Sequence, residues 1–245
     1  DAKYADVMER ILYNGVLSGL SLSGDRFFYP NPLASFGQHQ RTPWFTCACC
    51  PPNVARVLTS VPGYFYAASQ DSVYVNLFAE GRAAMSPRGT KLELRQKTEY
   101  PWQGDILIEV DPERPVAFRL HVRIPGWARN QPVPSDLYRY IEPPAGVPVL
   151  RVNGSEVKPP VEKGYAVIDR TWKSGDKVEL SLAMAPERIY AHPSVRHDAG
   201  RVALQRGPVV YCLEEVDNGP DLADLRLPPV AELDVHPGPA DLGGV

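Results

Sequence analysis

The chain has 245 residues, of which 44% are hydrophobic and 22% charged, which is enough for one or two packed globular domains. Its formal charge of −3 excludes a nucleic-acid-binding protein that works through bulk positive charge. No apolar run approaches the roughly 18 residues of a transmembrane helix, so we expect no membrane partner.

Two segments near the start show the three- and four-residue spacing of apolar side chains that is typical of amphipathic helices. We expect the first helix within residues 3–20 and the second within residues 53–61. Asn53 is a candidate N-cap of the second helix, and Pro62–Gly63 is a stop signal for it. The residues between the two helices have the composition of a loop-rich connector.

From about residue 64 the apolar side chains recur at every second position, which is typical of strands with one buried face. Seven such segments, separated by glycine-containing turn signals, predict an antiparallel β-sandwich. The segments are residues 73–78, 91–96, 105–110, 117–124, 149–152, 165–169 and 177–182. The predicted fold class is therefore multidomain α+β.

Two further stretches interrupt or follow the predicted sandwich. The proline-rich residues 130–148 are expected to form a long surface insertion in it. The apolar block 202–214 could begin another β unit, and Cys212 within it is expected to be a buried small hydrophobic residue. Almost no helix is expected between the second helix and residue 185.

The spacing of the cysteines indicates metal binding or a reactive thiol rather than a disulfide framework. Cys47, Cys49 and Cys50 lie within four residues and close no loop, so we expect them to be reduced, which favours a cytoplasmic location. Thiols just before a helix N-terminus are expected to have a lowered pKa, as metal ligands and nucleophiles do. An inert structural cluster is the alternative.

A closed zinc site needs more ligands than these adjacent cysteines supply. The five histidines show no metal-binding spacing. His39 lies in a polar loop and is expected at the surface. His121 is expected on the polar face of a strand, either solvated or paired across the sheet. The remaining ligands are therefore not evident from the residues alone.

Several motifs follow one another along the chain in a combination that is more specific than any one of them. They are YADVMERILYN at residues 4–14, SGLS at 18–21, FFY at 27–29, NPL at 31–33, CCPPN at 49–53, IPGWA at 124–128 and QRGP at 205–208. Together they resemble the β-L-arabinofuranosidase family, glycoside hydrolase family 127. The resemblance covers nearly the whole chain.

The resemblance implies a retaining glycoside hydrolase that releases β-L-arabinofuranose or a related sugar. It implies that residues 1–68 are the terminal helices of a catalytic (α/α)6 barrel, followed by antiparallel β-sandwich domains. Residues 69–187 would be the middle β-sandwich, and residues 188–245 the start of an incomplete C-terminal β domain.

The resemblance also implies roles for individual residues. Cys49 would be the catalytic nucleophile, and Cys49 and Cys50 would ligate zinc. Glu9 and Tyr29 would contact the sugar, although a solvated helix glutamate and a core tyrosine are the alternatives. All four side chains are then expected to converge on one concave surface.

Members of this family carry an acid/base glutamate and two more zinc ligands before the first of these motifs, and this chain has no counterpart of them. We therefore expect a fragment with an incomplete zinc site that is inactive alone. Its helices should expose the apolar side chains of Ile11, Leu12 and Val57. The full-length parent is expected to act on glycosides and could form a homodimer.

Two other classes of protein compete with the glycosidase interpretation. One is a non-catalytic carbohydrate-binding β-sandwich, for which Trp102, Trp127 and Trp172 are candidate exposed platforms. The other is a structural zinc or cysteine protein. Zinc stoichiometry and an assay of the full-length parent with a p-nitrophenyl glycoside discriminate between these possibilities.

Overall fold

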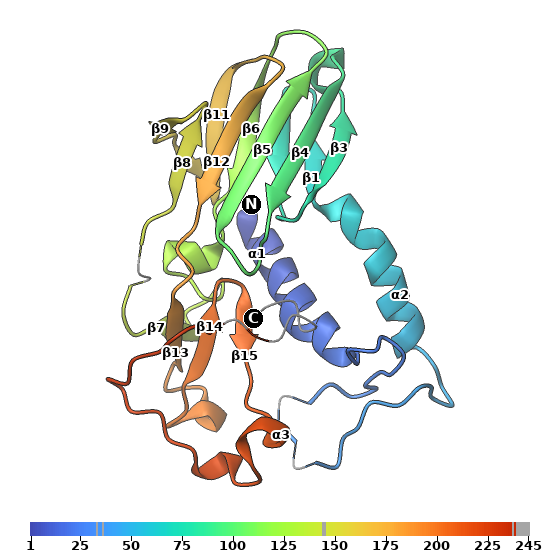
Figure 1. The fold of residues 1–245 in the computed structure, drawn as a ribbon, viewed down its shortest axis with the longest axis vertical. Coiled ribbons are helices and arrows are strands. Elements are labelled where there is room, and N and C mark those ends of the chain that lie inside the picture. The colour runs from blue at the N-terminus through green and yellow to red at the C-terminus, as the bar shows by residue number, and fades with distance from the viewer. Residues whose placement is uncertain (33, 36, 144–145, 237, 239–245) are drawn as a thin grey trace.

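The structure is a computed structural model, and it describes residues 1–32, 34–35, 37–143, 146–236 and 238. A β-sandwich forms one end of the molecule and a smaller sheet the other, and helix α1 (Ala2–Ile11) runs between them (Figure 1). Helix α2 (Cys50–Ser60) lies to one side, and the short helix α3 (Glu215–Asn218) follows the smaller sheet. Single 3-10 turns span Leu17–Gly19, Val61–Tyr64, Pro87–Gly89, Gly126–Arg129, Arg196–Asp198 and Leu222–Asp224.

The first helical segment occupies the predicted range, but it is not uniform. The carboxylate of Asp1 caps α1 by accepting a hydrogen bond from the backbone N–H of Lys3. After Ile11 the chain continues as a π-helical turn, Leu12–Val16, and then as a 3-10 turn. Such π-turns are uncommon and often occur at functional sites, so the end of this helix is of particular interest.

The second helix begins three residues earlier than predicted, at Cys50. Pro51–Pro52 fits into its first turn, because amide hydrogens have no partner there and a proline loses nothing. Asn53 is therefore not the N-cap, and its side chain instead donates a 2.9 Å hydrogen bond to the carbonyl of Cys49. The sequence predicted that the two prolines belong to the loop before the helix, but they form its first turn.

The sandwich consists of two sheets, and it contains all seven predicted strands. The first sheet has the order β1 (Tyr66–Ala68), β2 (Ser72–Val75), β6 (Val116–Arg123), β11 (Tyr165–Trp172) and β10 (Val161–Glu162). The second has the order β3 (Gly81–Met85), β4 (Leu92–Thr98), β5 (Asp105–Pro112), β12 (Asp176–Ser181), β8 (Val149–Val152) and β9 (Ser155–Val157). Neighbouring strands are antiparallel except β2 and β6, which are parallel.

Alternating side chains of both sheets meet in one hydrophobic core. Phe118 on β6 stacks on Trp172 on β11 with ring centroids 5.7 Å apart, and both side chains are buried. Leu94 and Ile108 are fully buried on the facing sheet. This burial supplies the main stabilisation of the sandwich, which is the base on which α1 lies.

The smaller sheet corrects one expectation, because residues 130–148 are not a plain surface insertion. Their segment β7 (Tyr138–Tyr140) pairs with β13 (Pro186–Ala191), which leads to β14 (Ala203–Arg206) and β15 (Val209–Tyr211). A three-residue strand between prolines carries too little periodicity to be recognised from sequence. Cys212, next to this sheet, is exposed, so the prediction that it is buried was wrong.

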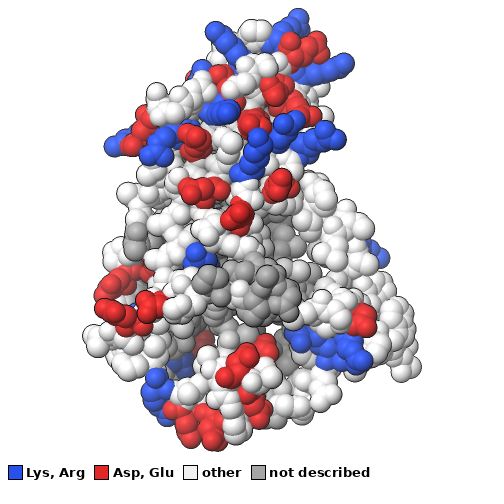
Figure 2. Space-filling view, in the orientation of Figure 1, with Lys and Arg blue, Asp and Glu red and all other residues white. Residues whose placement is uncertain are grey.

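The charged side chains of the sandwich surface lie in mixed pairs. Figure 2 shows basic and acidic residues interleaved over that end of the molecule. Lys97 on β4 pairs with Glu109 on β5 at 3.0 Å, and Arg119 pairs with Asp71 at 3.1 Å. Exposed pairs of this kind contribute little to stability, about 0–1 kcal/mol each.

The helices leave part of their apolar surface uncovered. Ile11 is exposed, as predicted, whereas Leu12 and Val57 are half-buried. Of the residues of α2, only Pro51 is buried. Within the described part of the chain, no helix combines the length and the apolar character that crossing a bilayer requires.

Candidate active site at the start of the second long helix

The thiol groups of Cys49 and Cys50 lie side by side where α2 begins, with their Sγ atoms 3.7 Å apart. Cys49 is exposed and Cys50 is half-buried, and neither forms a disulfide. The first turn of α2 holds this arrangement, since its prolines restrict the backbone directly after the two thiols. The site therefore combines a rigid base with thiols that small molecules can reach.

Tyr29 joins this pair from the loop between the helices. Its backbone carbonyl accepts a long contact of 3.7 Å from the thiol of Cys50. The ring packs edge-on against Phe45, with centroids 5.2 Å apart. The structure thus brings together Tyr29, Cys49 and Cys50, which are three of the four predicted site residues.

The electrostatics of the site differ from the expectation that a helix N-terminus lowers the thiol pKa. Burial and the hydrogen bond with Cys49 raise the pKa of Cys50. The hydrogen bond to Cys49 and the negative charge of neighbouring thiolates raise the pKa of Tyr29. Pro51 and Pro52 also contribute no amide hydrogen to the helix start, so this helix has two fewer donors that could stabilise a thiolate.

The spacing of the two sulfur atoms fits a shared metal ion. Two thiolates bound to one tetrahedral zinc at about 2.3 Å are separated by roughly 3.8 Å, the edge of the tetrahedron. The 3.7 Å between the Sγ atoms of Cys49 and Cys50 matches that edge. Among the described residues, however, no group of three His, Cys, Asp or Glu side chains could hold a metal. Cys49 and Cys50 could therefore supply two of the four ligands of a tetrahedral zinc site.

Glu9 does not join the thiols, contrary to the predicted convergence of all four side chains. Its carboxylate is buried and forms an ion pair with Arg123 of β6, while the hydroxyl of Tyr100 donates to it at 2.7 Å. Arg123 also pairs with Asp6 at 2.7 Å. The buried face of α1 points at the sandwich, and the carboxylate of Glu9 contacts Arg123 and Tyr100 there.

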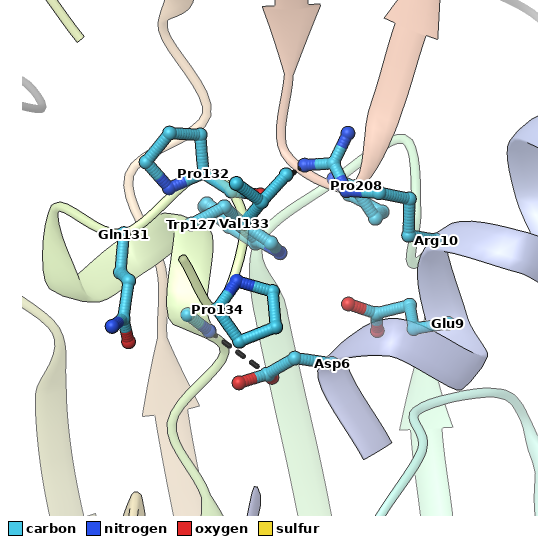
Figure 3. Close-up of a pocket in the computed structure, with 10 residues that line it drawn as sticks. Asp6, Glu9, Arg10, Trp127, Gln131, Pro132, Val133, Pro134 and Pro208 are labelled. Atoms are coloured by element: carbon cyan, nitrogen blue, oxygen red, sulfur yellow. Dashed lines mark hydrogen bonds between the residues drawn. The ribbon is translucent and has the colours of Figure 1, made fainter. Parts of the chain in front are cut away.

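A small cavity of about 20 Å³ lies beside this ion pair (Figure 3). Asp6, Glu9 and Arg10 line it from α1, and Trp127 and the segment 131–134 line it from the sandwich side. A cavity of this size holds about one water molecule, which is far too little for a sugar ring. The carboxylates of α1 therefore face a packed junction and not a substrate pocket.

The partners of Glu9 are residues that the sequence did not reveal. Arg123 occupies a strand position where polar and apolar side chains alternate, and Tyr100 lies in a turn. Burial and the negative charge of Glu9 raise the pKa of Tyr100, so its hydroxyl stays protonated and acts as a donor. The alternating pattern places Arg123 on the polar face of its strand, so nothing in the sequence marks its contact with Glu9.

The structure also shows the environment of His121 and of the three tryptophans that were candidate carbohydrate platforms. His121 is buried and paired across the sheet, which is one of its two predicted arrangements, because β2 places Tyr74 opposite it and the two rings stack with centroids 4.1 Å apart. Trp127 and Trp172 are buried and offer no exposed platform, and Trp102 is half-buried. The sandwich therefore lacks two of its three candidate carbohydrate-stacking residues.

Models of known protein families match three consecutive parts of the chain. Residues 1–63 match the catalytic domain of the β-L-arabinofuranosidases of glycoside hydrolase family 127. Residues 72–184 match the middle domain, and residues 186–239 the C-terminal domain, of the same family. The thiol pair lies within the part that matches the catalytic domain.

Individual relatives agree with these matches. A non-reducing end β-L-arabinofuranosidase of Bifidobacterium longum subsp. longum is 34% identical over 241 residues, which cover 92% of this chain and 34% of that protein. A crystal structure of a family 127 β-L-arabinofuranosidase from Geobacillus stearothermophilus T6 is 44% identical, with a TM-score of 0.89, and covers 100% of this chain and 38% of that one. A solved family 127 β-arabinofuranosidase is 49% identical, with a TM-score of 0.85, over 89% of this chain and 34% of that one.

The chain thus spans about a third of the length of these relatives. Within that third, the three family matches follow one another in order and cover almost all described residues. The chain belongs to glycoside hydrolase family 127.

Proposed function

We propose that this chain is the thiol-bearing part of a retaining glycosidase that acts on β-L-arabinofuranosides, with Cys49 as its nucleophile. The observation that carries the proposal is the exposed pair of thiols at the start of α2, held 3.7 Å apart and bordered by Tyr29. The relatives named as β-L-arabinofuranosidases support the choice of substrate class.

Zinc belongs to this proposal as the group that Cys49 and Cys50 would hold, together with two donors from outside the described cluster. When bound, zinc supplies deprotonation of its thiol ligands at neutral pH, where an ordinary cysteine is largely protonated. Cys50 is the more enclosed thiol and suits a purely ligating role. Cys49 is exposed and is the thiol that a substrate can reach.

The chemistry of Cys49 follows the two-step scheme of retaining glycosidases. Its Sγ donates an electron pair to the anomeric carbon, the bond from that carbon to the leaving-group oxygen breaks, and a general acid protonates this oxygen. Water then attacks the same carbon from the side that the leaving group left, gives up a proton to the general base, and restores the thiolate of Cys49. The anomeric configuration is retained because it is inverted twice.

Tyr29 is proposed to contact the sugar while it holds Cys49. Interaction with Cys49 raises the pKa of its hydroxyl, and its ring packs edge-on against Phe45. With a raised pKa, the hydroxyl keeps its proton and remains a donor to a thiolate or to a ring oxygen. Glu9 is not part of this set, since Arg123 and Tyr100 occupy its carboxylate.

We further propose that activity requires the part of the relatives' length that this chain does not span. The scheme needs a carboxylic acid and two more metal donors, and the described residues hold no such cluster near the thiols. The chain alone is then inactive. A reducing, cytoplasmic setting is part of the proposal, because Cys49 and Cys50 must be thiols to act as nucleophile and ligands.

The experiment compares cysteine variants in a protein of the relatives' full length that contains this chain. The substrate is p-nitrophenyl β-L-arabinofuranoside. Cys49→Ser should lower kcat at least about a thousandfold, as expected when a nucleophile is removed. Cys47→Ser, in the same exposed loop, is the matched control and should keep most of the activity. Unchanged kcat in Cys49→Ser would overturn the proposal.

A further inference from the structure

Asn14 connects the helical segment to the smaller sheet through both ends of its amide group. Its Nδ2 donates to the carbonyl of Pro208 at 2.9 Å, and its Oδ1 accepts from the backbone N–H of Val210 at 2.7 Å. Nδ2 also donates to the carbonyl of Arg10 at 3.0 Å. The side chain thus imitates a strand backbone alongside β15, and its three partners define which way the amide is turned.

Arg10, one turn earlier, makes a second connection to the same unit. Its guanidinium donates to the side-chain carbonyl of Gln205 at 2.9 Å and to the carbonyl of Pro132. Gln205 is buried and bonds in turn to Tyr140 of β7. The helix motif at residues 4–14 and the QRGP motif at residues 205–208 are therefore two halves of one junction.

The loop that carries Tyr29 is attached to the helical turns directly after Asn14. The side-chain amide of Asn31 donates to the carbonyl of Gly15 at 2.9 Å and to the hydroxyl of Ser18 at 3.1 Å. Arg41 donates to the carbonyl of Ser18 at 2.7 Å. The position of the loop thus depends on where the π-helical turn and the turn after it are held.

These contacts form a continuous series from the smaller sheet to the thiols. Asn14 holds Pro208 and Val210, the following turn holds Asn31, and Tyr29 two residues before it contacts Cys50. Coupling between separate parts of a protein requires a physical connection of this kind. Here the connection consists of the hydrogen bonds of Asn14 and Asn31 and the contact between Cys50 and the carbonyl of Tyr29.

We propose that Asn14 is a positioning residue that couples the smaller sheet to the thiol site. By clamping the backbone of residues 208–210, it fixes the helical turn to which the Tyr29 loop is tied. That loop then stays against Cys50 and limits access to this half-buried thiol. This proposal rests on the proposed function only in that the two thiols are taken as the functional groups of the site.

The test measures access to the thiols directly in the 245-residue chain, so it does not depend on catalysis. Iodoacetamide alkylation of Cys49 and Cys50 is followed by peptide-resolved mass spectrometry, and hydrogen exchange is followed in residues 27–31 and 208–211. In Asn14→Ala we expect alkylation of the half-buried Cys50 to be about fivefold faster, the change that corresponds to loss of one net hydrogen bond, while the exposed Cys49 reacts as in the unaltered chain. Exchange should rise in both segments.

Asn153→Ala is the matched control, because Asn153 also uses both ends of its amide, toward Asp176 at 2.8 Å and from the N–H of Lys177 at 2.8 Å. It lies in the sandwich and should lose stability without a change in alkylation. Asn31→Ala, at the surface, should speed alkylation while exchange in residues 208–211 stays as in the unaltered chain; this variant decides the matter if Asn14→Ala does not fold. Equal alkylation rates in the unaltered chain and the deciding variant would overturn the proposal, as would an equal rise in Asn153→Ala.

Discussion

Arg123 of the sandwich and Glu9 of the first helix form an ion pair in which both side chains are almost completely buried. Burial alone would lower the pKa of Arg123, but the negative charge of Glu9 and of Asp6 raises it, so the guanidinium stays charged. A buried pair of this kind need not add net stability, yet removing one partner leaves an uncompensated charge. It therefore fixes how α1 lies on the sandwich.

The first prediction concerns this pair. Arg123→Met should lower the free energy of unfolding by about 3–5 kcal/mol, because Glu9 and Asp6 lose a common buried partner. Arg119→Met, on the same strand, breaks an exposed pair with Asp71 and should cost no more than about 1 kcal/mol. Urea unfolding of the 245-residue chain measures both. Similar losses in the two variants would contradict a buried ion pair at Glu9.

The second prediction concerns two hairpin turns with the same backbone conformation. Gly154 and Gly164 both have positive φ, at 78° and 86°, after a residue that also has positive φ. A Cβ on Gly154 would meet nothing within 4 Å, whereas one on Gly164 would lie 2.6 Å from the Cβ of Ala2 in α1. We expect Gly154→Ala to cost about 1–2 kcal/mol for its backbone alone.

Gly164→Ala should cost measurably more than Gly154→Ala, because it adds a clash with the first turn of α1 to the same backbone strain. Hydrogen exchange at the start of α1 should rise only in Gly164→Ala. If both variants lose equal stability and α1 is protected equally in both, then α1 does not rest on this hairpin.

The third prediction concerns pH and His121. Burial lowers the pKa of His121 from its usual 6.5; the charge of Arg119 adds to this effect, and Glu162 and Asp71 oppose it. As the pH falls below about 6.5, the unfolded chain takes up this proton and the folded chain does not, so the free energy of unfolding decreases. The loss continues until the pH reaches the lowered pKa of the folded state.

His121→Phe removes this proton uptake while it keeps a ring to stack on Tyr74. Its free energy of unfolding should therefore fall less steeply than that of the unaltered chain as the pH falls below about 6.5. Denaturant titrations at several pH values give both curves, and their difference isolates the contribution of His121. Parallel curves would show that the histidine titrates alike in the two states.

Much of the fold was predictable because its signals are local. The alternation at residues 117–124 and the spacing within residues 3–20 predicted a strand and a helix, and both are present. The strand β7 was missed, since three residues show no usable period and it pairs with a strand more than forty residues away. The start of α2 was misjudged because Pro51–Pro52 suits a loop and a first helical turn equally.

The site was predictable only in part, for a reason of geometry. Cys49, Cys50 and Tyr29 are brought together by a loop and a helix start that are close in sequence. The position of Glu9 depends instead on Arg123 and Tyr100, whose contacts span about a hundred residues. Which face of α1 is buried was decided by these distant partners, and the helix itself gave no indication of them.

The central claim is that Cys49 forms a covalent bond to the sugar during turnover. Intact and peptide mass spectrometry of the full-length protein, quenched during turnover of a β-L-arabinofuranoside with an activated leaving group, tests it most directly. We expect one pentosyl adduct on the peptide that contains Cys49, located at that residue by fragmentation and lost on further incubation in water. An adduct on a carboxylate, or full turnover with Cys49 never modified, would contradict it.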